Sequence, residues 1–162
     1  MSARRRRRWA PVLAAAATAS LVALAGATMT DLGPWYQSLR KPPWQPPDWL
    51  FGPAWTVIFG LAAAAFVKAW RSAPDRPRGD WIIVLFSVNG VLNILWSALF
   101  FRVKRPDWAF IEVLFLWASI VLLIVMVGRH SRPAAALLLP YLAWVTFAAA
   151  LNLSVARLNG AL

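Results

Sequence analysis

The sequence predicts an all-α integral membrane protein, a bundle of five transmembrane helices with a Pro/Trp-rich loop between the first and second. Three observations support this. The 162-residue chain is 60% hydrophobic and only 14% charged. Its apolar residues form runs of about 20 residues, the length an α-helix needs to cross the hydrocarbon core of a bilayer. The charged residues stand almost entirely between these runs, as the high cost of placing charge in lipid requires.

The first predicted span covers residues 9–30 and follows a basic tail, residues 1–8. This segment also resembles a signal peptide, with basic residues, an apolar stretch and small residues around Ala23 to Ala25. Cleavage there would leave four spans. The apolar stretch exceeds the usual signal-peptide length of about 7–15 residues, which favours a retained helix.

The four other spans are predicted at residues 49–70, 81–101, 108–127 and 134–156, within a single domain, residues 9–162. Three of them begin at an Asp-Trp pair, with Asp48, Asp80 and Asp107. A carboxylate can cap free backbone N–H groups, and an indole suits the membrane interface. We therefore expect these Asp residues to be helix caps.

Orientation follows from the distribution of Lys and Arg on the two sides of five spans. The N-terminal side holds Arg4 to Arg8, Lys68, Arg71, Arg76, Arg78, Arg129 and Arg132. The other side holds Arg40, Lys41, Arg102, Lys104, Arg105 and Arg157. Because the more basic side is usually cytoplasmic, we expect a multi-pass protein with a cytoplasmic N-terminus and the first loop on the opposite side.

Composition excludes several function classes. The net charge of +11 does not indicate nucleic-acid binding, because the cations stand at the ends of apolar runs instead of on one face. The absence of Cys excludes disulfides and thiolate chemistry. We find no Ser/His/Asp constellation, paired carboxylates, P-loop or metal-ligand spacing, and His130 lies alone in a basic loop. We therefore expect no catalytic residues, no metal and no required cofactor.

Helical spacing places polar and aromatic residues on shared faces of three spans. These faces comprise Asn89, Asn93, Trp96 and Phe100; Tyr141, Trp144, Ala148 and Asn152; and Trp108, Glu112, Phe115 and Ser119. Amide groups should point away from lipid, where they can hydrogen-bond between helices or line a cavity. Several interior indoles on such faces suggest a pocket for a flat apolar ligand.

Glu112 is the one carboxylate expected well inside a span, and such a group is a functional candidate by default. The alternative is that it lies near the interface, where it is hydrated or paired with Arg102, Lys104 or Arg105. We favour this alternative because Glu112 comes only a few residues after Asp107.

The loop after the first span crowds prolines among tryptophans in WYQSLRKPPWQPPDWLFGPAW, residues 35–55. The prolines from Pro42 to Pro47 favour an extended path, and Pro53 falls near the start of the second span, where its missing N–H costs little. We expect a stiff loop that folds over the mouth of the bundle. It would place Trp35, Tyr36 and Trp44 against whatever lies between the helices.

These motifs resemble the TspO/MBR family, the tryptophan-rich sensory and translocator proteins. The family pattern WYxxLxKPxWxPP followed by FxPxW matches residues 35–55. LNILWSALFF at 92–101 and PYLAW at 140–144 match later parts, so the resemblance runs from about Trp35 to Asn159. It implies a five-helix bundle, commonly a homodimer, that retains its first span and binds porphyrins or other flat apolar molecules beneath the first loop.

Matching the motifs residue by residue gives the ligand-binding candidates that the resemblance implies. They are Trp35, Tyr36, Trp44, Phe51, Trp55, Asn93, Trp96, Trp144 and Ala148. Ile58-Phe59 departs from the Leu-Tyr often found in the family and lacks its hydroxyl.

Three functions are compatible with this prediction. The first is a membrane receptor or regulator that holds a tetrapyrrole between the loop and the helices. The second is an enzyme in which pocket tryptophans take part in light- or oxygen-dependent porphyrin breakdown, an activity suggested by the resemblance alone. The third is a transporter of tetrapyrrole or lipid, which is disfavoured because the sequence shows no inverted repeat or interrupted helix pair.

Overall fold

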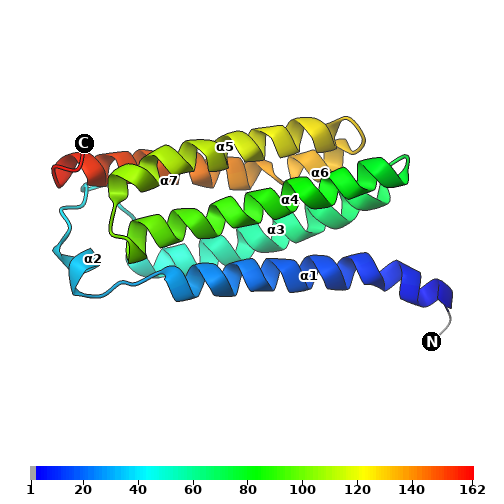
Figure 1. The fold of residues 1–162 in the computed structure, drawn as a ribbon, viewed down its shortest axis with the longest axis horizontal. Helices are drawn as coiled ribbons and strands as arrows, with labels where there is room; N and C mark the ends of the chain where they lie inside the picture. The colour runs from blue at the N-terminus through cyan, green and yellow to red at the C-terminus, as the bar shows by residue number, and fades with distance from the viewer. Residues whose placement is uncertain (1–2) are drawn as a thin grey trace.

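The computed structural model describes residues 3–162, with the side chains of residue 13 and residues 15–162. The longer helices run side by side along the long axis of the molecule (Figure 1). In chain order, the elements are α1 (Ala3–Met29), α2 (Pro34–Ser38), a 3₁₀ turn (Asp48–Leu50), α3 (Phe51–Arg71), α4 (Arg76–Ser97), a π-helical turn (Ala98–Arg102), α5 (Pro106–Gly128), α6 (Arg132–Ala136) and α7 (Leu139–Leu158). The described residues contain no β-strand.

The predicted all-α membrane bundle is confirmed. Four helical segments are long and apolar enough to cross a membrane, namely Asp48–Arg71, Arg76–Arg102, Pro106–Gly128 and Arg132–Leu158. Ala15–Met29 of α1 forms a shorter apolar helix. The side chains of the predicted basic tail, residues 1–8, lie outside the described part of the chain, and its cytoplasmic location stays a prediction.

Two of the three predicted Asp caps are wrong because their helices begin earlier than expected. Asp75 caps α4, where its carboxylate accepts a hydrogen bond of 2.9 Å from the backbone N–H of Arg78. Asp80 consequently lies inside that helix. Asp107 lies in the first turn of α5 and not at its N-cap, which is Arg105, and its carboxylate pairs with the Arg105 side chain. The third, Asp48, belongs to the loop described below.

The fifth crossing consists of two helices. α6 ends at Ala136 and α7 begins at Leu139, so Pro140 stands in the first turn of α7. A proline at that position removes no intrahelical hydrogen bond. The break therefore accommodates Pro140 without a defect inside a long helix.

α5 packs along both α4 and α7, and α1 packs along α3 and α4 (Figure 1). Away from α2, the helices meet through small and branched apolar side chains that are 0–1% exposed: Ala65, Ala69, Leu123, Val127, Ala134 and Leu138. We call this the closed end. The end that carries α2 and the last turn of α7 is the loop end.

The predicted face of α5 is wrong in two of its four positions. Glu112 is buried and Ser119 half-buried, but Trp108 and Phe115 are 50% and 63% exposed. Contact with both α4 and α7 buries a different row, which includes Ala109, Glu112 and Leu116.

The interpretation favoured for Glu112, hydrated or paired with a basic residue, is also wrong. Its side chain is only 6% exposed, and neither carboxylate oxygen has a hydrogen-bond partner among the described residues. It belongs to the buried row of α5, the helix that packs on both α4 and α7, and the ion pairs of the described residues do not include it.

Candidate binding pocket

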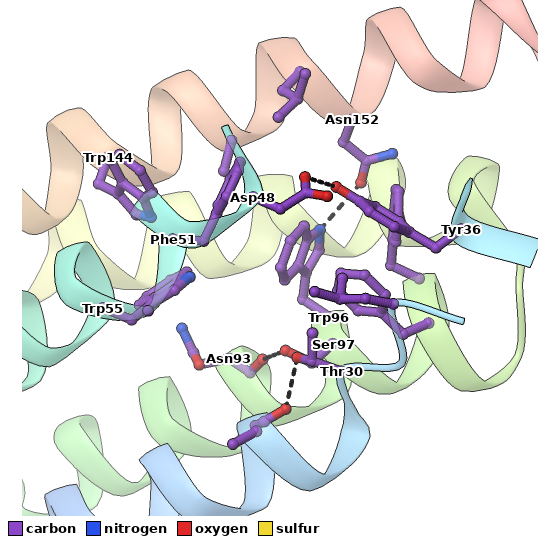
Figure 2. A pocket seen from close by; sticks show the side chains of 18 of the residues that line it. Thr30, Tyr36, Asp48, Phe51, Trp55, Asn93, Trp96, Ser97, Trp144 and Asn152 are labelled. Carbon is purple, nitrogen blue, oxygen red and sulfur yellow. Dashed lines mark hydrogen bonds between the residues drawn. The ribbon is translucent and has the colours of Figure 1, made fainter. Parts of the chain in front are cut away.

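A cavity of about 610 Å³ lies between the first loop and the helices at the loop end. This volume falls within the usual range of about 300–1,000 Å³ for small-molecule sites. Figure 2 shows side chains from the loop and from several helices converging on it. α1, α3, α4 and α7 all contribute to the wall, with α1 supplying the small residues Ala23, Gly26 and Ala27. These small side chains leave space that larger rings from the other helices line.

Aromatic rings from α3, α4 and α7 form much of the wall. Trp144 meets Phe51 and Trp55 edge to face, with ring centroids 5.7 Å and 6.4 Å apart. Phe59 stacks on Trp55 with ring centroids 5.3 Å apart. Trp96 completes this group from α4. Edge-to-face contacts are a favourable arrangement that fixes the orientation of these rings, and indole faces along a cavity wall suit a flat apolar molecule.

Polar side chains behind the rings hold the helices in register. Asn93 lines the cavity and donates to the Tyr141 hydroxyl at 3.1 Å, and that hydroxyl donates to the Asn89 oxygen at 3.1 Å. The Asn89 amide in turn donates to Ser119 on α5 at 2.8 Å. This chain of hydrogen bonds confirms that the Asn face of α4 points into the bundle, and it joins α4 to both α5 and α7.

A second polar contact fixes Trp96. Its indole N–H donates to the Asn152 oxygen at 3.1 Å, and the Asn152 amide donates to the Pro106 carbonyl at 2.7 Å. Trp96 and Asn152 both line the cavity. Their hydrogen bond therefore fixes the orientation of the Trp96 ring in the wall and also joins α4 to α7.

The indole N–H of Trp144 differs from that of Trp96. It is buried and pairs with no described residue. A buried donor without a partner costs free energy, on the order of 1–3 kcal/mol. It therefore offers a hydrogen bond to an acceptor atom on a bound molecule.

The first loop covers the cavity and is pinned by side-chain hydrogen bonds. The hydroxyl of buried Tyr36 donates to Asp48 Oδ1 at 2.8 Å, and the Gln45 amide donates to both groups at 3.2 Å. Burial, together with the hydrogen bond to Asp48, raises the pKa of the Tyr36 phenol well above its ordinary value. The third predicted cap, Asp48, is thus also wrong: its side chain binds the loop.

The far side of the loop is attached to the end of α7. Asn159 accepts a hydrogen bond from the Arg40 backbone N–H and donates one to the Arg40 carbonyl, both at 2.9 Å. This paired contact joins residues far apart in the sequence and makes the loop part of the bundle.

Seven of the nine predicted ligand-binding residues line the cavity: Tyr36, Phe51, Trp55, Asn93, Trp96, Trp144 and Ala148. The other two do not. Trp35 packs edge to face on Phe100 at 6.0 Å, and Trp44 packs on Phe147 at 5.8 Å and is 47% exposed. Both rings brace the loop from outside the cavity.

Sequence reasoning missed several polar residues of the cavity, including Lys41, Gln45, Asp48 and Asn152 as a wall residue. The spacing of Asp48 before an apolar run suggested a cap, and only the folding back of the loop brings it to Tyr36. The loop motif contains Lys41, but the motif alone does not show that Lys41 lines the cavity.

Comparison with known proteins identifies the family. The model of the TspO/MBR family matches residues 11–158. This chain belongs to the TspO/MBR family. It is 40% identical to the Tryptophan-rich protein TspO of Chlorobaculum tepidum, over 85% of this chain and 89% of that protein. It is 37% identical to the Translocator protein of Ovis aries, over 73% and 70% of the two chains. It is 32% identical to the Tryptophan-rich sensory protein of Cereibacter sphaeroides, over 93% and 92%.

Membership in the TspO/MBR family confirms the predicted resemblance and, with the long apolar helices, identifies a membrane protein. The matched region includes all the elements that line the cavity, from α1 through the loop to α7.

Proposed function

We propose that this protein is a membrane receptor that binds a porphyrin or related tetrapyrrole in the cavity beneath its first loop. The observation that carries the proposal is the aromatic cavity itself, with Trp55, Trp96 and Trp144 along its wall. Stacking on indoles favours flat, apolar rings. The unpaired Trp144 N–H adds a donor for an acceptor atom of the ligand.

The test is a titration of the detergent-solubilised protein with a porphyrin dicarboxylic acid in the dark, followed by quenching of tryptophan fluorescence. We expect saturable quenching and an affinity about tenfold lower in Trp144→Phe, since a lost hydrogen bond and a smaller ring cost about 1–1.5 kcal/mol. Trp81→Phe is the matched control, because Trp81 is 65% exposed and lies away from the cavity.

Equal affinities for the wild type and Trp144→Phe would contradict the assignment of the site, and an absence of saturable quenching would contradict the function. Repeating the titration under illumination distinguishes the receptor from a porphyrin-degrading enzyme. A receptor yields no product beyond the protein-free control, whereas an enzyme does.

The proposed topology, with a cytoplasmic N-terminus and the loop on the opposite side, is supported by the distribution of Lys and Arg. The chain has no Cys, so single cysteines report position directly. Gln37→Cys and His130→Cys place a thiol at exposed sites in the loop and in the α5–α6 turn. We expect an impermeant thiol reagent to label the first in intact cells and the second only after permeabilisation; the reverse would invert the topology.

We also propose a homodimer. Its support is a row of exposed small residues on α3, Gly60 and Ala64, one turn apart, where a Cβ added at Gly60 would meet nothing within 4 Å. Such rows allow two helices to approach closely in lipid. Gly60→Leu should therefore reduce dimer formation measured by cross-linking, and an unchanged yield would exclude this face.

A further inference from the structure

Two of the residues that line the cavity carry charge, Lys41 and Asp48. Asp48 already accepts hydrogen bonds from the Tyr36 hydroxyl and the Gln45 amide. Lys41 differs, because its ammonium lies 3.7 Å from the centroid of the Tyr36 ring and forms no ion pair with a carboxylate of the described chain. The cavity thus has a positive charge at its mouth that is paired only with an aromatic face.

The backbone around Lys41 is held on both sides. The preceding residue, Arg40, is bonded through its N–H and carbonyl to Asn159 on α7. The following residue, Pro42, is buried and has a restricted φ angle. The ring beneath the ammonium is fixed as well, since the Tyr36 hydroxyl is bonded to Asp48. The backbone of Lys41 is therefore held in place, and its ammonium lies over a Tyr36 ring that is itself fixed.

The charged residues that line the cavity lie on the loop side of it. Lys41, Tyr36 and Gln45 belong to the loop that covers the mouth. The helices contribute only uncharged side chains to the described wall, both rings such as Trp55 and Trp144 and polar groups such as Asn93 (Figure 2). An ammonium at the border of an apolar cavity is partly shielded from water, and charge-assisted hydrogen bonds are strong there.

We propose that Lys41 binds a carboxylate of the ligand. The cavity then selects flat apolar molecules that carry an anionic group at one edge, and it orients them with that edge toward the loop. This inference rests on the proposed function, because it requires that the cavity bind a flat apolar molecule. It adds the ligand's required charge and its direction in the site.

The experiment compares a porphyrin dicarboxylic acid with its dimethyl ester, which has the same ring system and no charge. Each is titrated in the dark against the full-length wild type, Lys41→Gln, Lys41→Arg and Arg40→Gln. Arg40→Gln is the matched control, because it removes one charge from the adjacent exposed residue while its backbone bonds to Asn159 remain possible. Melting temperatures of all four proteins report whether the loop substitutions disturb the fold.

We expect Lys41→Gln to weaken binding of the diacid about tenfold to a hundredfold and to leave binding of the diester unchanged. Lys41→Arg should keep the diacid affinity within about threefold, and Arg40→Gln should behave as the wild type. Diacid binding to the wild type should also weaken at high salt more than diester binding does.

Equal losses for both compounds in Lys41→Gln would overturn the inference, because Lys41 would then act only through the packing of the loop. An unchanged diacid affinity would overturn it too. Failure of the proposed function looks different: neither compound then binds the wild type saturably, and both proposals fall together.

Discussion

The two ends of the bundle use the same helices in opposite ways. At the closed end, Leu123 and Leu138 pack against Ala65, all at 0–1% exposure. At the loop end, Trp55 and Trp144 meet at 85° and leave a cavity of about 610 Å³ between the helices. Small side chains at a contact let helices approach closely, whereas large side chains such as indoles increase the distance between helix axes.

The difference separates stability from binding. The closed end gains dispersion energy from dense packing, which a cavity lacks. The loop end relies on hydrogen bonds between side chains, such as those from Tyr36 to Asp48 and from Trp96 to Asn152. Substitutions at the closed end should therefore lower stability without changing ligand affinity, and those at the loop end should have smaller effects on stability, with losses of ligand affinity where they alter the cavity wall.

The largest effect is expected for Leu123→Ala. Leu123 is 1% exposed, and truncation would leave a hole that its neighbours on α3, α4 and the α6–α7 turn cannot fill. The free energy of unfolding in detergent should fall by about 2–5 kcal/mol, with unchanged porphyrin affinity. Leu122→Ala is the matched control. Leu122 is 44% exposed, so its truncation should lower the free energy of unfolding far less. A large loss of affinity in Leu123→Ala would show that the two ends are coupled.

Tyr141→Phe tests the layer between the two ends. It removes the hydroxyl that binds both Asn93 and Asn89, and leaves two buried amides short of a partner. We expect a loss of about 1–2 kcal/mol in the free energy of unfolding. Porphyrin affinity should also fall slightly, since Asn93 lines the cavity. Unchanged stability would mean that these amides find other partners.

Much of this arrangement could be predicted from the sequence. Apolar run length predicts the crossings, and the i, i+4, i+7 spacing predicts that Asn93 and Trp96 share an inward face. Such predictions succeed because lipid imposes a helix and penalises outward amides. The pocket residues on α3, α4 and α7 follow from the same spacing together with the family motifs.

The remaining features depend on contacts between distant segments. Asp48 has the spacing of a cap but bonds to Tyr36, twelve positions earlier. The prediction of which α5 residues are buried was wrong in part. Helical spacing shows which residues share a face of a helix, but not which face the neighbouring helices cover. Lys41 acquires its position from Asn159, 119 positions from Arg40, which no local pattern contains.

Asn159→Ala should have a smaller effect on stability, because the contact with Arg40 is exposed. We expect a loss of at most about 1 kcal/mol in the free energy of unfolding. The loop itself should open more often, which limited proteolysis between Pro42 and Asp48 would detect as faster cleavage. Arg40→Gln, which keeps the same backbone groups, serves as the control. Equal cleavage rates for all three proteins would show that the Tyr36–Asp48 contact alone holds the loop.

Substitution of Glu112 is expected to have the smallest effect on the free energy of unfolding, and to raise it where the other substitutions lower it. A carboxylate paired with a neighbouring cation would make substitution costly, on the order of 3–5 kcal/mol. In the bundle, both of its oxygens are buried without a partner among the described residues, so they contribute no hydrogen bond that could be lost. Glu112→Met has a similar length and removes two unsatisfied atoms, and it should leave the free energy of unfolding unchanged or raise it by about 1 kcal/mol. A clear loss of stability in Glu112→Met would show that the carboxylate has a partner in the membrane, and would make this buried face of α5 a polar site like the loop end.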